Sequence, residues 1–346
     1  TQHMTDDLVN RRLKAGKLPP ELLARFLGDL VSSDKRILLG PGVGEDAAFV
    51  SFGSTTLIAK SDPITFATDR IGWYAIQVNA NDIAACGGTP KWFLATLLLP
   101  ENEPAFTVRN IFAQLRDAAN KLGITLIGGH TEITVGISRP IISGTMLGEA
   151  APSETVKTSS ANVGDDVILT SGIAIEGTAI IARESKGELL AAGLSLPVIL
   201  KAADFLDSPG ISIVKAAKIA TSTGYVTAMH DPTEGGLAGA LDELARASNT
   251  GIAINADHVR IYPETEAICR ALELDPWGLI ASGALLITSS PNGSQPIIDA
   301  LGGFGIPATV IGKITGPEDG LTRNINGATE QLPEFERDEI ARLYST

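Results

Sequence analysis

The sequence predicts a mixed α/β fold, because strand-length apolar runs alternate with amphipathic helical segments in both halves of the chain. Hydrophobic residues occupy 44% of the 346 positions and aromatic residues only 5%, which is typical of a core built from Ala, Val, Ile and Leu. The 36 glycines indicate many tight turns between these elements. A chain of this length favours two domains, each large enough to bury its own core.

The first half begins with a helix opened by a Pro-Pro pair at 19–20, whose apolar side chains recur at helical spacing. A strand over 55–60 follows, and then a helix over 70–86 that a Gly-Gly pair ends. The remaining elements are expected to be a strand over 92–99, a helix over 106–122 with a glycine past its end, a buried strand over 124–127, and a strand over 141–147.

The segment 150–162 is poor in large apolar residues and rich in Ser, Thr and Pro, so we place the domain boundary near residue 155. The two domains are then 1–155 and 156–346. The second is expected to contain a strand over 166–170, a helix from 176, helices over 196–206 and 212–223, a strand over 226–229, a helix over 236–247, strands over 285–288 and 309–314, and a surface helix from 333.

Composition excludes several classes of partner. A net charge of −13 argues against nucleic acid, which requires clustered Lys and Arg. The two cysteines, Cys86 and Cys269, give neither a disulfide framework nor a cysteine-rich metal site, and we expect both to be buried thiols. No window reaches the roughly 18 apolar residues that a membrane helix requires. We therefore expect no membrane partner and a cytoplasmic location.

Acidic residues occupy special positions in the first half. In the segment Gly42–Asp46 (GVGED), the two glycines permit positive φ and let a ligand approach the backbone, although a turn with solvated acids fits the same pattern. Asp62 follows the strand over 55–60, a common position for a turn residue. Asn81 and Asp82 lie in an apolar helix and need partners there, because an unpaired buried carboxylate is costly. A metal ion, a helix N-terminus or an Arg would serve.

The segment Gly128–Glu132 (GGHTE) directly follows a predicted strand. In open α/β sheets, ligands gather at the carboxyl ends of strands. His130 or Glu132 is therefore a candidate metal ligand, acid–base group or supporting residue, while a purely structural histidine remains the alternative.

The segment His230–Gly236 (HDPTEGG) turns from a predicted strand into a predicted helix. Thr233 is a candidate N-cap and Glu234 an acid favoured by the helix dipole, which leaves the preceding His-Asp pair unexplained. The helix N-terminus also suits a phosphate. Walker, nucleophile-elbow and zinc-helix motifs are absent from the sequence. Acidic, oxygen-rich turns are suitable ligands for hard cations, and such cations bind phosphates. The sequence therefore indicates a nucleotide enzyme that binds phosphate through a metal ion.

Taken together and in this order, these motifs resemble the superfamily of aminoimidazole ribotide (AIR) synthetase, thiamine-monophosphate kinase, selenophosphate synthetase and the hydrogenase-maturation factor HypE. The resemblance spans residues 35–315, and Asp231–Leu237 and Ile175–Ala179 look most like the HypE branch. It implies an AIR-synthetase-like N-terminal domain that forms an inter-subunit β-barrel in a homodimer, and a C-terminal α/β sandwich. It also implies ATP in the cleft, with its phosphates held by Mg²⁺.

By motif matching, the resemblance implies roles for individual side chains. The metal-facing carboxylates would be Asp46, Asp62, Asp82 and Asp231. The residues lining the nucleotide phosphates would be Gly42, Gly44, Asn81, Gly128, Gly129, Thr131, Gly235 and Gly236. The candidates for acid–base work or phosphate contact are His130, Glu132 and Lys60.

The sequence departs from each named member. HypE proteins end in a cysteine that carries the thiocarboxamide, whereas the last four residues here are Leu-Tyr-Ser-Thr. Selenophosphate synthetase has a reactive Cys or selenocysteine near its N-terminus, whereas the first cysteine here is Cys86. The kinase places an acid after its Gly-Gly pair, where this chain has His130. The Gly-Thr-Asp-Gly-Val-Gly-Thr-Lys motif of the purine enzyme is also missing. The shared part is the ATP–metal apparatus, and the acceptor is unidentified.

Three functions follow as hypotheses. The first is a Mg²⁺-dependent, HypE-like enzyme that cleaves ATP to activate an oxygen of a small acceptor. The second is a nucleotide-binding accessory protein that docks on a maturation partner and has no turnover of its own. The third is a kinase of a small phosphorylated metabolite, resembling thiamine-monophosphate kinase. Phosphate release from Mg·ATP separates the first from the second, and a phosphorylated product identifies the third.

Overall fold

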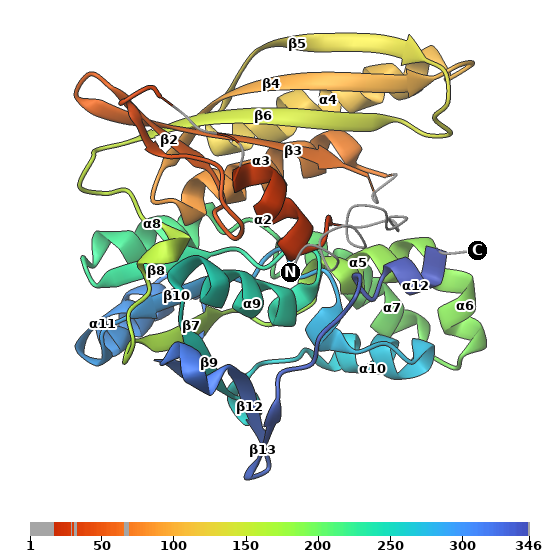
Figure 1. Ribbon diagram of the computed structural model, residues 1–346. Helices are drawn as coiled ribbons and strands as arrows, with labels where there is room; N and C mark the ends of the chain where they lie inside the picture. Colours follow the sequence, from red (N-terminus) through yellow and green to blue (C-terminus); the bar gives the residue numbers. More distant parts are fainter. Residues whose placement is uncertain (1–16, 29, 31–32, 66–68, 345–346) are drawn as a thin grey trace, which may run out of the picture.

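The computed structural model describes residues 17–28, 30, 33–65 and 69–344. Two β-sheets with flanking helices form the fold, one sheet in each half of the chain (Figure 1). This arrangement confirms the mixed α/β class predicted from the sequence. In the described part of the chain, no helix combines the length and the apolar character that a bilayer crossing requires.

Six strands form the first sheet, which lies at the top of Figure 1. The strands are β1 (Ile37–Leu39), β2 (Ala48–Phe52), β3 (Thr55–Ile64), β4 (Thr89–Pro100), β5 (Thr125–Thr134) and β6 (Ile141–Ala150). Their order is β1-β2-β3-β6-β4-β5, and only the β4–β5 pair is parallel. Residues of β6 are alternately buried and half-buried, so helices cover one face and the other is partly open.

Three helices accompany this sheet: α2 (Pro20–Gly28), α3 (Ile71–Ala85) and α4 (Ala105–Leu122). α3 packs against β3, β6 and α4, and also against α8 (Val214–Ser222) of the second half. Of its 15 residues, 14 are buried, which confirms the buried helix predicted from its apolar sequence. α3 therefore forms a layer between the first sheet and the second half, as Figure 1 shows.

Seven strands form the second sheet, in the order β13-β12-β9-β11-β7-β10-β8. They are β7 (Asp166–Thr170), β8 (Val226–His230), β9 (Gly251–Asn255), β10 (Leu286–Ser289), β11 (Ala308–Thr315), β12 (Leu321–Ile325) and β13 (Ala328–Gln331). Here too a single pair, β9–β12, is parallel. Because most neighbours in both sheets are antiparallel, the ends of successive strands do not gather at one edge.

The remaining helices surround the second sheet, and some of them pack against the first half. They are α5 (Ile175–Glu184), α6 (Lys186–Ala191), α7 (Leu196–Ala203), α9 (Gly236–Ser248), α10 (Pro263–Leu272), α11 (Pro291–Gly302) and α12 (Ala341–Tyr344). Apolar side chains from both halves share one cluster, in which Ile83 and Phe93 join Ile175 and Ile340. Cys86 and Cys269 are buried free thiols, as expected.

Three expectations about elements are wrong. The strand predicted over 124–127 continues to Thr134, and its side chains are exposed rather than buried. Asp62 lies inside β3, not after the end of the strand. No surface helix begins at 333, because residues 333–340 form turns and bends with Asp338, Glu339 and Ile340 buried. The sequence also gave no prediction of β1, β9, α11, β12 or β13.

Candidate active site

The structure brings the four predicted metal ligands together around one lysine. Asp46 lies in the loop before β2, Asp62 in β3, Asp82 near the end of α3, and Asp231 directly after β8. Lys60 of β3 is within electrostatic reach of all four carboxylates. Its Nζ lies 3.4 Å from Oδ2 of Asp82. Only the fold unites these residues, which come from both halves of the chain.

The loop that carries Asp46 depends on the glycine at position 44. Gly44 has a φ of +83°, and a Cβ there would lie 2.5 Å from the backbone oxygen of Glu243. Only glycine accepts both conditions, so the loop can lie directly on α9 and deliver Asp46 to the interior. Gly42 does not have a positive φ, and that part of the expectation is wrong.

Burial dominates the electrostatics of the acids. It raises the pKa of Asp82 to about 8 and the pKa of Asp231 well above its ordinary value, with the neighbouring carboxylates adding to both shifts. It also raises the pKa of Asp62, which is half-buried. Burial alone would lower the pKa of Lys60, but the surrounding carboxylates raise it above its ordinary value. Lys60 is therefore a charged partner of the acids in the absence of any bound cation.

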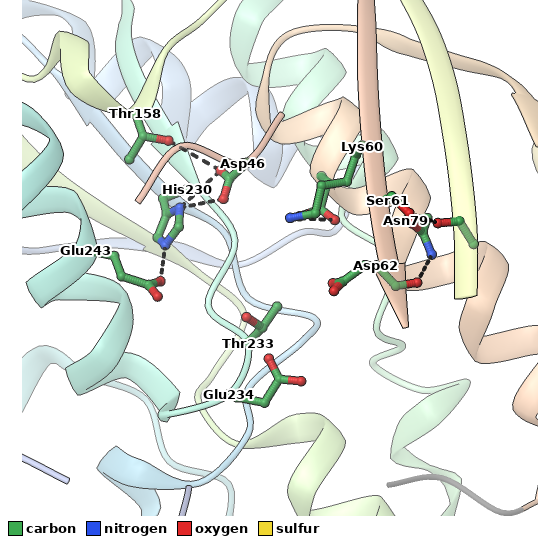
Figure 2. A network of polar contacts seen from close by, with 12 residues as sticks. Asp46, Lys60, Ser61, Asp62, Asn79, Thr158, His230, Thr233, Glu234 and Glu243 are labelled. Atoms are coloured by element: carbon green, nitrogen blue, oxygen red, sulfur yellow. Dashed lines mark hydrogen bonds and ion pairs between the residues drawn. The ribbon is translucent and has the colours of Figure 1, made fainter. Parts of the chain in front are cut away.

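A buried histidine pairs with two carboxylates beside Asp231. Nδ1 of His230 lies 2.8 Å from Oδ1 of Asp46, and Nε2 lies 2.9 Å from Oε2 of Glu243 (Figure 2). Lys17 donates to Glu243 over 3.1 Å. Burial alone would lower the pKa of His230, but Asp46 and Glu243 raise it well above its ordinary value. The imidazole is therefore a buried cation within the cluster.

The opposite shift occurs at Glu243, which faces His230 from α9. Burial by itself would raise the pKa of Glu243, but Lys17 and His230 together lower it to about 2. On the Asp46 side, the hydroxyl of Thr158 lies 3.3 Å from Oδ2. Sequence reasoning gave none of these supporting residues a role. A signal existed for Glu243, because it shares a helix face with the small residues at 236, 240 and 247.

The cluster fits a hard divalent cation. Both carboxylate oxygens of Asp231 are buried and have no hydrogen-bond partner in the described part of the chain. A carboxylate oxygen of Asp46 and one of Asp231 lie within 4.8 Å of each other, whereas the neighbouring His230 is protonated and supports Asp46 rather than offering a ligand atom. Carboxylate oxygens are the ligands that Mg²⁺ takes, and a buried carboxylate without a partner is costly. The donor set and the unsatisfied oxygens are therefore those that a bound cation would use.

The structure does not bring the segment Gly128–Glu132 to this cluster. Paired residues form a row across four neighbouring strands. His130 of β5 pairs with Thr96 of β4, Thr96 pairs with Ser143 of β6, and Ser143 pairs with Pro63 of β3. Three strand spacings of about 4.8 Å give a separation of about 14 Å from β3. Rather than forming a turn, the segment lies in an exposed strand next to an irregularity of the β4–β5 register.

Within that strand, the predicted residues have other surroundings. The exposed side chains of His130 and Glu132 lie 3.5 Å apart and face each other rather than the acids. The other predicted members of the segment are part of the same exposed strand, namely Gly128, Gly129 and Thr131. In a single copy of the chain, the acid–base and phosphate roles expected for this segment therefore have no support.

Other predicted phosphate contacts already have protein partners. The amide of Asn81 donates to the backbone oxygen of Ile211 over 2.8 Å and accepts from the N–H of Ile213 over 2.9 Å. Asn81 thus positions that loop rather than a nucleotide. The N–H of Gly235, at the start of α9, donates to Asp338 over 2.7 Å. Its neighbour Gly236 lies against the backbone of the segment 276–279, where a Cβ would collide.

Two cavities lie near the cluster, and only the smaller is lined by one of its acids, Asp62. The larger, of about 660 Å³, lies between α2, residues 39–45 and the end of α9 at Arg246 and Ala247. It reaches Glu45, next to Asp46. The smaller lies between β3 with α3 and the loop that follows β8, and it is lined by Asp62, Glu176 and Glu234 among others. Figure 2 shows Asp62 on β3 facing Thr233 and Glu234 across this region.

Comparison with known proteins gives one family for both halves. The N-terminal domain model of AIR synthase related proteins matches residues 44–150, and the C-terminal domain model matches 162–323. A carbamoyl dehydratase HypE of Rhizobium leguminosarum bv. viciae is 25% identical over 285 residues, which are 80% of this chain and 78% of the relative. A thiamine-monophosphate kinase of Pyrococcus horikoshii is 28% identical over 305 residues, 84% and 88% of the two chains.

Solved structures have the same fold. A HypE–HypF complex matches with a TM-score of 0.71 at 21% identity, covering 85% of this chain and 94% of the other. The hydrogenase maturation protein HypE in complex with ATP matches with a TM-score of 0.70 at 20% identity, covering 92% and 91%. At these identities, the likeness concerns the path of the backbone and not the ligands.

Proposed function

Because the chain belongs to the AIR synthase related protein family, we propose that it binds ATP with Mg²⁺ and cleaves it to activate an oxygen of a small acceptor. The observation that carries this proposal is Asp231, a fully enclosed carboxylate with both oxygens unpaired beside Asp46. A bound cation would offset the cost of burying such a carboxylate. The solved structure of a HypE with ATP supports the nucleotide part of the proposal.

The larger cavity supports the position of the nucleotide. Its volume of about 660 Å³ lies within the range of roughly 300–1,000 Å³ that is usual for ligand pockets. It adjoins Glu45, so a nucleoside held there would direct its phosphates toward Asp46 and the acids behind it.

Each charged residue then has a part in the proposed reaction. Asp46, Asp62, Asp82 and Asp231 would hold Mg²⁺, which supplies neutralisation of the charge on the phosphates when it is bound. Lys60, now paired with Asp82, would turn to the phosphates as the carboxylates take up the cation. His230 holds Asp46 through Nδ1, and Glu243 holds the imidazole through Nε2.

We also propose that the chain forms a homodimer through β5. This strand is the edge of the first sheet, and its side chains are exposed along nearly its whole length. Leu126, Ile127 and Ile133 leave 39%, 50% and 68% of their surfaces in water. Pairing with a second copy would bury them and extend the sheet into a barrel. His130 and Glu132 would then lie at the interface between the copies.

Two further parts of the proposal rest on the comparisons. The family models leave residues 151–161 between them, so we keep the domain boundary near 155. A HypE assembles with HypF in a solved complex, so a maturation protein is a candidate partner of this chain as well.

The test is phosphate release from Mg·ATP by the purified protein and by the Asp82→Asn variant. We expect sustained release by the wild type and its loss in the variant, which should still fold because Asp62, Asp46 and Asp231 remain as carboxylate partners of Lys60. Asp117→Asn on the exposed side of α4 is the control and should keep full turnover.

The outcome also separates the three hypotheses. Stabilisation by nucleotide without phosphate release would assign the accessory role instead. Transfer of the γ-phosphate to a metabolite would assign a kinase. Release that persists in Asp82→Asn at the wild-type rate would contradict the proposed site.

A further inference from the structure

Lys17, in the segment before α2, reaches the second half of the molecule. Its Nζ donates to Oε1 of Glu243 over 3.1 Å and to the hydroxyl of Thr233 over 3.3 Å. Glu243 belongs to α9, and Thr233 belongs to the loop that follows β8. The contact with Glu243 extends the chain of charges through His230, whereas the contact with Thr233 has no part in that chain.

The ammonium group of Lys17 has an unused donor. An ammonium carries three N–H groups, and in the described part of the chain only the two acceptors above lie within hydrogen-bond distance. The carboxylate of Glu234 is 4.0 Å away, which is too far for a hydrogen bond. Because 46% of the Lys17 side chain is exposed, this long ion pair contributes little. A ligand can therefore reach the ammonium group without displacing a strong partner.

Lys17 lies beside the acidic cluster. Thr233 and Glu234, the neighbours of its ammonium group, line the smaller cavity together with Asp62. Figure 2 shows these two residues facing Asp62. Burial raises the pKa of Asp62, and the charges of Lys60 and Lys17 act against that shift. Both lysines are thus within electrostatic reach of this acid.

The segment that carries Lys17 also forms part of the larger cavity. Pro20, Glu21 and Ala24 of α2 line that cavity, and Glu21 pairs with Arg246 of α9 over 3.3 Å. The segment 17–24 therefore contacts α9 both at the cavity and beside the acids. A nucleotide with its nucleoside in the cavity and its phosphates directed toward the acids would lie against this segment.

Phosphates that enter this region require positive charge. The carboxylates of Asp62, Glu234 and Glu243 all lie near the ammonium of Lys17, and like charges brought close together disfavour one another. A lysine ammonium is a common phosphate ligand, because it is a compact charge whose donors can rotate. Lys17 is positioned to supply such a charge next to the one that Lys60 supplies.

We propose that Lys17 binds the terminal phosphate of the nucleotide, with Lys60 and the metal ion as the other positive groups. The inference rests on the proposed function and adds to it a phosphate-binding residue outside the acidic motifs. Glu243 and Thr233 hold the ammonium in place, and its unused donor goes to a phosphate oxygen. The terminal phosphate is the one that extends furthest from the nucleoside cavity, toward Thr233.

The test is a calorimetric titration of a non-hydrolysable ATP analogue and of ADP, each with Mg²⁺, into full-length wild type and Lys17→Met. We expect the variant to bind the analogue roughly ten- to a hundredfold more weakly, because a hydrogen bond between charged groups is lost. Its affinity for ADP should be unchanged, since ADP lacks the terminal phosphate. Lys218→Met, on the exposed side of α8, is the control and should bind both ligands as the wild type does.

Two further variants separate phosphate binding from structural support. Lys17→Arg keeps the charge and should retain most of the affinity for the analogue. Glu234→Gln removes a competing carboxylate and should strengthen binding of the analogue, which keeps the proposal testable if Lys17→Met does not fold. A purely structural role of Lys17, through Glu243 and His230, would weaken the analogue and ADP alike, because Asp46 would lose its support.

Several results would overturn this inference. They are equal weakening of both ligands in Lys17→Met, unchanged affinity of that variant for the analogue, a wild type that does not prefer the analogue to ADP, and weaker analogue binding by Glu234→Gln. A wild type that binds the analogue no better than Lys17→Met loses only the role of this lysine. A wild type that binds neither nucleotide loses the proposed function.

Discussion

His230 lies between two carboxylates and joins the loop that carries Asp46 to α9. Its two ring nitrogens face Asp46 and Glu243, and Lys17 continues the chain of charges on the far side of Glu243. Such alternation of positive and negative groups lets several charges remain ionised in the interior. Removing one member leaves its neighbour without a partner, which costs more than the pair contributes.

A double-mutant cycle measures this coupling. His230→Gln and Glu243→Gln should each lower the free energy of unfolding by about 3–5 kcal/mol, because each strands a buried charge. The double variant should lose clearly less than the sum. Urea unfolding in metal-free buffer gives the values, and Asp242→Asn, in an exposed pair on the same helix, should cost at most about 1 kcal/mol. Additive losses would show that the residues do not act as a network.

The carboxyl of Glu176 predicts a pH dependence of stability. Its pKa rises from 4.5 to about 8 on folding, so the folded state favours the protonated form. This contribution is fully present below pH 4.5 and is lost as the pH rises through 8. The groups that face Glu176 are Ser282, Glu234, Asp338 and Tyr74.

We therefore expect Glu176→Gln to be more stable than the wild type at pH 9, by about 2 kcal/mol, and to lose the advantage toward pH 4. Thermal melts across this range, without metal or nucleotide, make the comparison. A wild type whose stability relative to Glu176→Gln is the same at both ends would contradict the buried, protonated carboxyl.

At the scale of elements, the segment 332–340 holds the loop between β8 and α9 in place through a hydrogen bond to its backbone. Asp338 accepts from the N–H of Gly235 over 2.7 Å, and Glu339 accepts from the N–H of Asp275 over 2.9 Å. The predicted surface helix does not form, because these acids cap backbone groups of other segments and Ile340 is fully buried. The loop beside Asp231 is therefore held from outside the cluster.

The Asp338→Asn variant tests this connection. We expect a loss of about 1–2 kcal/mol, since a charge-assisted hydrogen bond becomes a neutral one. Hydrogen exchange should report faster opening at Gly235 and Ile340, with little change in the first sheet. Uniform destabilisation across both sheets would instead show that Asp338 supports the global fold rather than this loop.

The sequence predicted most helices and strands because their apolar spacing is regular. It failed where pairing between strands decides the outcome. The segment 128–132 was assigned to the end of a buried strand on a rule for parallel sheets, whereas the sheet is mostly antiparallel and β5 is its exposed edge. Short strands such as β12 and β13 carry no strong apolar pattern and were missed for that reason.

At the scale of the whole molecule, α3 joins the two halves. It is buried between the first sheet and α8, and Asn81 makes two hydrogen bonds to the loop at Ile211 and Ile213. Asp82, the next residue on the helix, belongs to the acidic cluster. The same helix thus contacts the second half through Asn81 and places the carboxylate of Asp82 in the cluster between both halves.

Removing the Asn81 amide should loosen this junction. Asn81→Ala leaves a backbone N–H and a backbone oxygen buried without partners, so we expect a loss of about 2–4 kcal/mol. The measurement is urea unfolding followed by one probe in each half. Two separated transitions are the expected sign of a weakened junction, and a single transition at the wild-type midpoint would contradict it.

The four acids of the site were predicted from the sequence by motif matching to the family. Asp46 and Asp231 stand near glycines and Asp82 lies in an apolar helix, whereas Asp62, between Ser61 and Pro63, has neither signal. The residues that support these acids could not be predicted, since His230, Glu243 and Lys17 meet only through contacts between α9, β8 and the segment before α2. Glu176 lies in the segment Ile175–Ala179, which resembles the HypE branch, but the burial of its carboxyl and its unpaired oxygen depend on how α5 packs in the fold.

Titration of the non-hydrolysable ATP analogue into wild type and Asp231→Asn, with and without Mg²⁺, tests most directly whether these acids hold a cation for the nucleotide. We predict that tight binding by the wild type requires Mg²⁺, and that Asp231→Asn folds normally but binds about a hundredfold more weakly in its presence. Equal affinity in the two proteins, or wild-type binding that is indifferent to Mg²⁺, would contradict the metal site.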